Sequence, residues 1–165
     1  MSSEALSAPA ISPRQASCWY WLSGLALAFS LTGSVAALEI QPVTDGVWAL
    51  VGENQQRSRE NLANNSTFGV VVTSEGVVLV DPGGSRKGAE AIHAAIRTIT
   101  DKPVKYVINT GGQDHRWLGN GYWQERGATV IAARKAVADQ HARVDLQLTM
   151  LRNFLGDALD GTEPR

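Results

Sequence analysis

An aspartate and a histidine stand next to each other, as Asp114 and His115, in a glycine-rich stretch at residues 109–120. A carboxylate and an imidazole are both zinc ligands, and catalytic zinc usually takes three protein ligands and keeps one position open. The chain has 3 histidines, and His93 and His141 fall in helical patterns away from this stretch. The pair alone therefore supplies at most two ligands, and a hydrogen-bonded loop pair without metal is the alternative.

The elements that must position this pair follow from changes in the hydrophobic period. Residues 43–52 have strand composition with the turn pair Asp45-Gly46, residues 53–61 form a polar loop, and residues 67–73 and 77–81 have the spacing of a hairpin. A helix with an apolar stripe over residues 91–99 then leads to a strand at 104–108. After the glycine-rich loop come a short helix at 119–126 and a strand at 128–132. Two or three antiparallel strands followed by β–α–β predict a mixed α/β (α+β) sheet with helices on one face.

Two further features concern packing. The nearly continuous apolar character of the hairpin strands predicts that these two strands are covered on both faces. Residues 135–155 form one long helical pattern, which we expect to dock on the sheet or on a partner. Its apolar stripe is Val137, His141, Val144, Leu148, Leu151 and Leu155.

Composition excludes two classes of function. With 15 basic and 16 acidic residues, the net charge of -1 offers no surface for neutralising phosphates, so no nucleic-acid partner is expected. The single cysteine, Cys18, excludes an intramolecular disulfide and a thiolate-rich metal cage.

The N-terminal segment indicates export. No charged residue occurs between Arg14 and Glu39, and this apolar stretch ends in small side chains at residues 34–37. We predict a signal peptide over residues 1–37, cut near Ala36 or Ala37, before a domain at residues 39–165. The alternative is an uncleaved anchor, which would be the chain's only contact with a membrane and would leave the domain facing the periplasm.

Several segments, in this order and spacing, resemble the metallo-β-lactamase superfamily. They are residues 65–72 (NSTFGVVV), 77–83 (VVLVDPG), 107–110 (VINT), Asp114-His115 and residues 118–120 (LGN). The similarity is greatest to the exported branch with class B lactamases and quinoprotein-associated zinc hydrolases. It spans the N-terminal half of that family's αββα sandwich.

The resemblance implies a role for each candidate residue. The family binds two zinc ions through an HxHxDH motif completed by ligands from its later half. Asp114 and His115 match the end of the motif and would be metal ligands and catalytic residues, while Thr110 and Gly112 stand where the first two histidines belong. Moving the alignment by one residue places Gly111 and Gln113 there. The resemblance assigns to Asp81 hydrogen-bonding support of the metal loop, and capping of the next helix is the alternative.

These implications lead to two functional hypotheses. The first is an exported, hydrolase-like protein, degenerate or truncated, with zinc at no more than one site and a small-molecule substrate. The second is a non-catalytic periplasmic protein that binds a small molecule or a protein partner through the same cleft. The polar loop at residues 53–64 would form a flap over that cleft. Half a sandwich would expose a sheet face, so we also expect loose packing and poor solubility.

Overall fold

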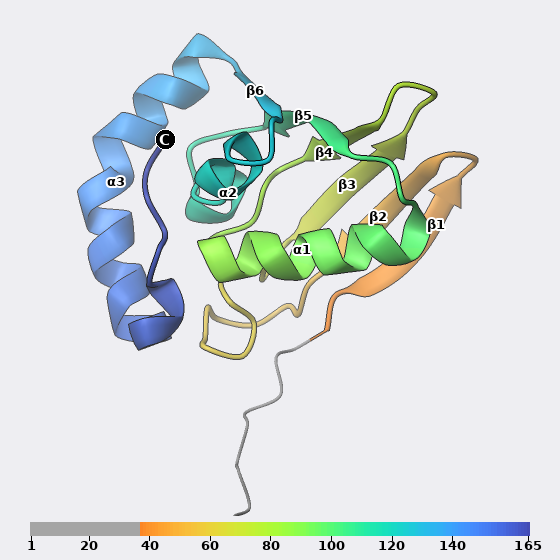
Figure 1. Cartoon of the computed structure of the whole chain (residues 1–165). Coiled ribbons are helices and arrows are strands. Elements are labelled where there is room, and N and C mark those ends of the chain that lie inside the picture. Colours follow the sequence, from red (N-terminus) through yellow and green to blue (C-terminus); the bar gives the residue numbers. More distant parts are fainter. Residues whose placement is uncertain (1–36) are drawn as a thin grey trace, which may run out of the picture. The chain divides into compact units, whose positions relative to one another are not determined.

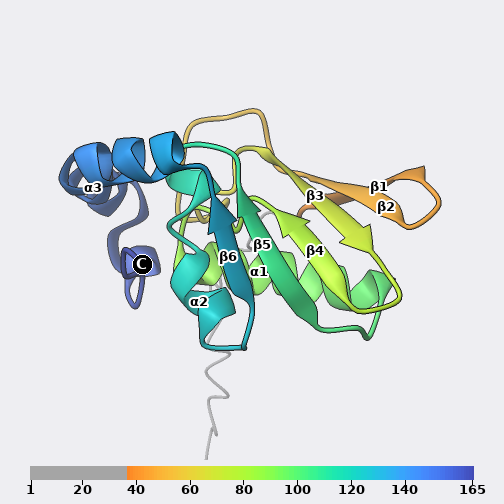
Figure 2. The same ribbon diagram turned by 90° about the horizontal axis from the view of Figure 1, so that it is seen from above.

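The computed structural model describes residues 37–165, which form one body built on a sheet (Figures 1 and 2). The expected signal peptide, apart from Ala37, and Cys18 lie outside the described residues. Within residues 37–165, no helix has the length and apolar character needed to cross a membrane.

The six-stranded sheet has the order β1-β2-β3-β4-β5-β6. The strands are β1 (Glu39–Thr44), β2 (Val47–Val51), β3 (Thr67–Val72), β4 (Val77–Val80), β5 (Val104–Asn109) and β6 (Thr129–Ala132). The helices are α1 (Arg86–Ile99), α2 (Asn120–Gln124) and α3 (Arg134–Leu155), with short 3-10 helices η1 (Asp114–Arg116) and η2 (Gly156–Leu159). Strands β1 to β4 pair antiparallel, and β5 and β6 are added in parallel through α1 and α2. The expected mixed α+β sheet is confirmed.

The strand expected within residues 43–52, opened by the turn pair Asp45-Gly46, is confirmed as β2, but the strand before this turn was not predicted. Two strands, β1 and β2, meet at a turn in which Gly46 has a φ of 75°. Strand β1 lies at the edge of the sheet, where Pro42 can be accommodated because half of the backbone groups need no partner. All of its residues are exposed, so it has no apolar alternation that would have revealed it.

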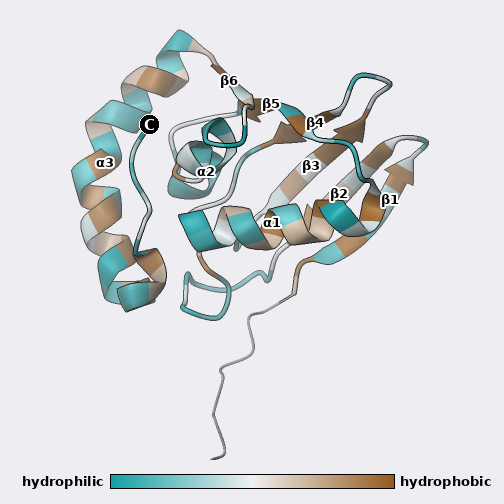
Figure 3. Cartoon of the chain, in the orientation of Figure 1, coloured by the Kyte–Doolittle hydropathy of each residue, from teal (hydrophilic) through white to brown (hydrophobic). Residues whose placement is uncertain are grey.

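One face of the sheet carries the main hydrophobic core. Phe68, Val70, Leu79 and Val107 on this face are fully buried with residues of α1 and α2. Ser85 caps the N-terminus of helix α1, because its hydroxyl accepts a hydrogen bond from the Gly88 amide at 2.9 Å. Figure 3 shows hydrophobic colouring along most of β3 and β4.

The prediction that the hairpin strands are covered on both faces was wrong for the part of the chain described here, because Val78 and Val80 of β4 are only half-buried. On the face opposite α1, the side chains of Tyr106, Ile108 and Ile131 are 44%, 37% and 48% exposed. The side chains of a strand point alternately to the two faces, and burial of Val107 under α1 leaves its neighbours in β5 on the other side. The expected loose packing and poor solubility stay predictions.

Helix α3 docks mainly through its C-terminal half, and not on the sheet. Leu151 and Leu155 are fully buried in a second core with Trp117 and Leu118. The predicted apolar stripe was wrong for the N-terminal half, because Val137 is exposed and the buried positions are Gln140 and Gln147 instead. These two glutamines are buried because each donates a hydrogen bond to a backbone carbonyl, that of Gly111 or Gly112, which an apolar side chain could not do.

Candidate functional site

The candidate site is the loop of residues 110–119, which leaves the end of β5 beside the end of β4. Asp81 follows β4 directly with a φ of 63°. Its carboxylate accepts hydrogen bonds from the Thr110 amide at 2.8 Å and from the Thr110 hydroxyl at 2.8 Å and 3.0 Å. The alternative prediction, that Asp81 caps the next helix, was wrong, because Ser85 caps α1. Asp81 thus fixes the first residue of the 110–119 loop.

Backbone contacts hold the other end of the loop. The Gly83 amide donates to the His115 carbonyl at 3.1 Å, and the Gly119 amide donates to the Gly83 carbonyl at 2.9 Å. A Cβ on Gly119 would lie 2.4 Å from the carbonyl oxygen of Pro82. The glycines therefore serve close backbone packing.

Asp114 is held by an arginine that comes from another loop. Its carboxylate is 1% exposed and is bound by Arg57, whose Nη2 donates to Oδ1 at 2.6 Å and whose Nε donates to Oδ2. Arg57 belongs to the loop of residues 52–66, which contains the segment 53–64 that was expected to form a flap. This bidentate geometry, with two parallel hydrogen bonds, is the strongest form of a guanidinium–carboxylate pair. The hydrogen bond with Asp114 raises the pKa of Arg57, so both groups stay charged.

His115 is buried beside the same carboxylate. Its Nδ1 lies 3.3 Å from Oδ1 of Asp114, yet it makes no hydrogen bond with a protein group. A buried ring nitrogen without a partner is uncommon, because burial removes its contact with water and leaves the desolvation cost uncompensated. Asp114 and His115 therefore do meet in space, but only Asp114 has its hydrogen-bonding capacity used.

Acid should weaken the folded state through Asp114. Burial acts to raise the pKa of this carboxyl, but the contacts with His115 and Arg57 outweigh it and lower the pKa from 3.8 to about 2. The folded state thus favours the charged form, and the stability gained is present above pH 4 and is lost as the pH falls from about 4 to about 2. The loss should be about 2 kcal/mol. Urea unfolding of the wild type and of Asp114→Asn should show the difference in unfolding free energy shrinking over this range, whereas parallel pH profiles would contradict the assignment.

Two glutamines of α3 hold the middle of the loop. Gln140 donates to the Gly111 carbonyl at 3.1 Å, and Gln147 donates to the Gly112 carbonyl at 2.7 Å while it accepts from Trp117 Nε1 at 3.0 Å. Neither glutamine, nor Arg57, was predicted as a site residue. The available signal was the seven-residue spacing of the glutamines, which places them on one face of the helix.

The residues at this site do not fit a zinc ion of the family's kind. Thr110 and Gly112 stand where the family's first two histidines belong. The Thr110 hydroxyl is bound to Asp81. A side chain at position 112 has no room, because a Cβ there would lie 2.2 Å from Oδ2 of Asp139. Residues 37–165 contain no group of three or more histidine, cysteine, aspartate or glutamate side chains arranged to hold a metal ion. The other two histidines are elsewhere: His93 bonds to the Tyr122 hydroxyl at 2.8 Å, and His141 lies on α3.

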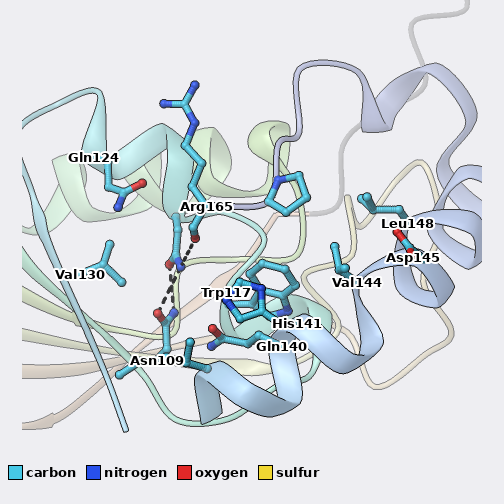
Figure 4. A pocket seen from close by; sticks show the side chains of 14 residues that line it. Asn109, Trp117, Gln124, Val130, Gln140, His141, Val144, Asp145, Leu148 and Arg165 are labelled. Atoms are coloured by element: carbon cyan, nitrogen blue, oxygen red, sulfur yellow. Dashed lines mark hydrogen bonds between the residues drawn. The ribbon is translucent and has the colours of Figure 1, made fainter. Parts of the chain in front are cut away.

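Two cavities flank the loop. The larger, of about 580 Å³, lies between α3, β6 and the C-terminal segment (Figure 4). The smaller, of about 490 Å³, lies over Asp114 and is also lined by Arg57, Arg143, Leu146 and Gln147. The two cavities share no lining residue, so the single cleft of the sequence-based hypotheses corresponds to two separate spaces.

Comparison with known proteins identifies the fold and the family. The family model of the metallo-beta-lactamase superfamily matches residues 63–159, more than half of the chain. The metallo-β-lactamase FIM-1 from Pseudomonas aeruginosa, solved in a mono-zinc form, is 15% identical with a TM-score of 0.55, and the alignment covers 67% of this chain and 48% of that one. The enzyme from Hirschia baltica is 18% identical with a TM-score of 0.55, covering 66% and 48%.

A third structure, the metallo-β-lactamase from Pontibacter korlensis, is 21% identical with a TM-score of 0.51, covering 66% of this chain and 47% of that one. Identities of this size show the shared fold alone. The chain spans about half the length of the solved structures that it matches. The family-model match and the shared half-sandwich together show that this chain belongs to the metallo-β-lactamase superfamily.

Proposed function

We propose that this chain is an exported, hydrolase-like member of the superfamily that binds a small organic molecule without zinc catalysis. The observation that carries the proposal is the pairing of Arg57 with Asp114. This pairing commits one of the two motif residues that could ligate a metal, and the described residues supply no third ligand.

Export is proposed from the apolar N-terminal segment. It is tested by sequencing the mature N-terminus, which should begin near Ala36 or Ala37.

The larger cavity has the properties of a small-molecule site. Its volume of about 580 Å³ lies in the range of about 300–1,000 Å³ typical of ligand pockets. Trp117, Val144 and Leu148 provide apolar walls. Asn109 and Asn120 form an amide pair within it, with hydrogen bonds of 3.0 Å and 3.2 Å between their side chains (Figure 4).

The polar groups at this cavity favour a ligand that combines a flat apolar body with hydrogen-bond donors. His141 and Asp145 lie one turn apart on α3, and both line the cavity. A carboxylate and a neutral imidazole offer acceptors to a ligand amine or hydroxyl. The Trp117 ring beside them presents an apolar face for an aromatic or aliphatic body.

Filling this cavity should abolish ligand binding. We expect small aromatic amines, screened by saturation-transfer NMR, to bind the wild type and to lose binding in Val144→Trp, because the larger side chain occupies the cavity. The matched control is Leu146→Trp, which places the same side chain on the exposed side of α3, where Leu146 is 73% exposed. Amines that bind Val144→Trp as well as the wild type would overturn the proposal.

A mononuclear zinc hydrolase is the second candidate, and the unpartnered Nδ1 of His115 is the observation that favours it. A buried ring nitrogen without a hydrogen-bond partner, next to a carboxylate, can supply two ligands to one zinc ion if other groups complete the site. Calorimetric titration with zinc should then give 1:1 binding that is lost in His115→Ala. The absence of binding would remove this candidate.

A further inference from the structure

We infer that the guanidinium of Arg57 is the resident cation of this site and takes the place of a metal ion as the counter-charge of Asp114. This inference concerns the charge beside the loop and stands independently of the proposed ligand cavity. It predicts that a soluble cation can occupy the site when Arg57 is removed.

The first support is the way in which Arg57 is presented. The 52–66 loop is fixed by the side chain of Asn61. Its Oδ1 accepts from the backbone amides of Ser58 at 2.9 Å and Ala63 at 3.1 Å, and its Nδ2 donates to the Gln56 carbonyl at 2.8 Å. Asn61 is 5% exposed. Arg57 is thus held on a pre-formed loop, which lowers the entropy lost in reaching Asp114.

The second support is that the neighbouring cations are engaged elsewhere. Arg143 lines the same small cavity, but its Nε binds Asp139 at 2.6 Å. Arg116 directs Nη1 to the Thr110 hydroxyl at 3.1 Å. Among the described residues, Arg57 is therefore the arginine that donates hydrogen bonds to the Asp114 carboxylate.

The third support is the cost of leaving this carboxylate alone. A charge buried to 1% exposure without a counter-charge is strongly destabilising, whereas removal of both charges together costs little. A divalent metal ion could reach Asp114 only by displacing Arg57 from both oxygens. The ion pair thus excludes the metal and also replaces its charge.

The test measures melting temperature in three variants, with methylguanidinium and zinc as the probes. Arg57→Ala should lower Tm by roughly 10 °C or more. Millimolar methylguanidinium or zinc should raise the Tm of this variant by several degrees more than that of the wild type. The double variant Arg57→Ala/Asp114→Asn should be more stable than Arg57→Ala and should show no such response. Arg143→Ala, which removes an exposed arginine from the same cavity, should lose little stability and show no response.

Three outcomes would overturn the inference. They are an Arg57→Ala variant as stable as the wild type, a destabilised variant that neither cation stabilises beyond its effect on the wild type, and zinc binding by the wild type that depends on Asp114. If Arg57→Ala does not fold, the double variant decides: a folded double variant supports a charge role, and an unfolded one contradicts it. The ligand-binding experiment with Val144→Trp does not involve Arg57, so the first two outcomes leave it unaffected, whereas zinc binding by the wild type would also contradict the proposed absence of zinc catalysis.

Discussion

Gly119→Ala is expected to lower the unfolding free energy by about 3 kcal/mol, through a collision between two backbone segments. The added Cβ would lie 2.4 Å from the Pro82 oxygen, 2.9 Å from the Pro82 carbonyl carbon and 3.0 Å from the Gly83 oxygen. Backbone atoms cannot rotate away as a side-chain end can. The φ of Gly119 is -77°, so the cost comes from the contact and not from backbone strain.

The matched control for this prediction lies two residues along the chain. A Cβ on Gly121 would have its nearest contact at 3.4 Å, with the flexible end of Arg165. Gly121 lies in α2, where alanine is favoured over glycine by about 1 kcal/mol, so Gly121→Ala should be as stable as the wild type or more stable. Urea unfolding of both variants is the measurement, and equal effects in the two would show that the close approach of the 110–119 loop to residues 82–83 is not rigid.

Asp81→Ala is expected to cost about 3 kcal/mol in unfolding free energy, because it leaves two donors of Thr110 without their acceptor. The change also places an alanine at a φ of 63°, a conformation that alanine adopts only with strain. Loosening of Thr110 should extend along the loop to Trp117. Equilibrium urea unfolding and tryptophan fluorescence are the measurements.

Asp81→Asn is the conservative comparison for this prediction. Asparagine tolerates a positive φ, and its carbonyl oxygen can still accept from the Thr110 amide. We therefore expect Asp81→Asn to lose about 1 kcal/mol, a minor part of the effect of alanine. If the two variants were equally unstable, the hydrogen bonds to Thr110 could not be the source of the stability that Asp81 contributes to the folded state.

Much of the fold could be predicted from the sequence because its signals are local. The β-branched runs at 67–73 and 77–81 and the apolar stripe of α1 each report on residues that lie a few positions apart. The adjacency of Asp114 and His115 is equally local. The edge strand β1 gave no such signal, since an edge strand exposed on both faces needs no alternation.

The sequence by itself determined the order of the elements, the position of the Asp114-His115 pair and the membership of the pair in a glycine-rich loop. Only the tertiary structure decided what binds that pair. Arg57 is 57 residues away from Asp114 along the chain, and Gln147 is 35 residues away from Gly112. The polar loop has no periodicity that marks Arg57. The seven-residue spacing of Gln140 and Gln147 marks one face of α3 but does not identify the partner of that face, because hydrogen bonds between distant segments depend on how those segments pack.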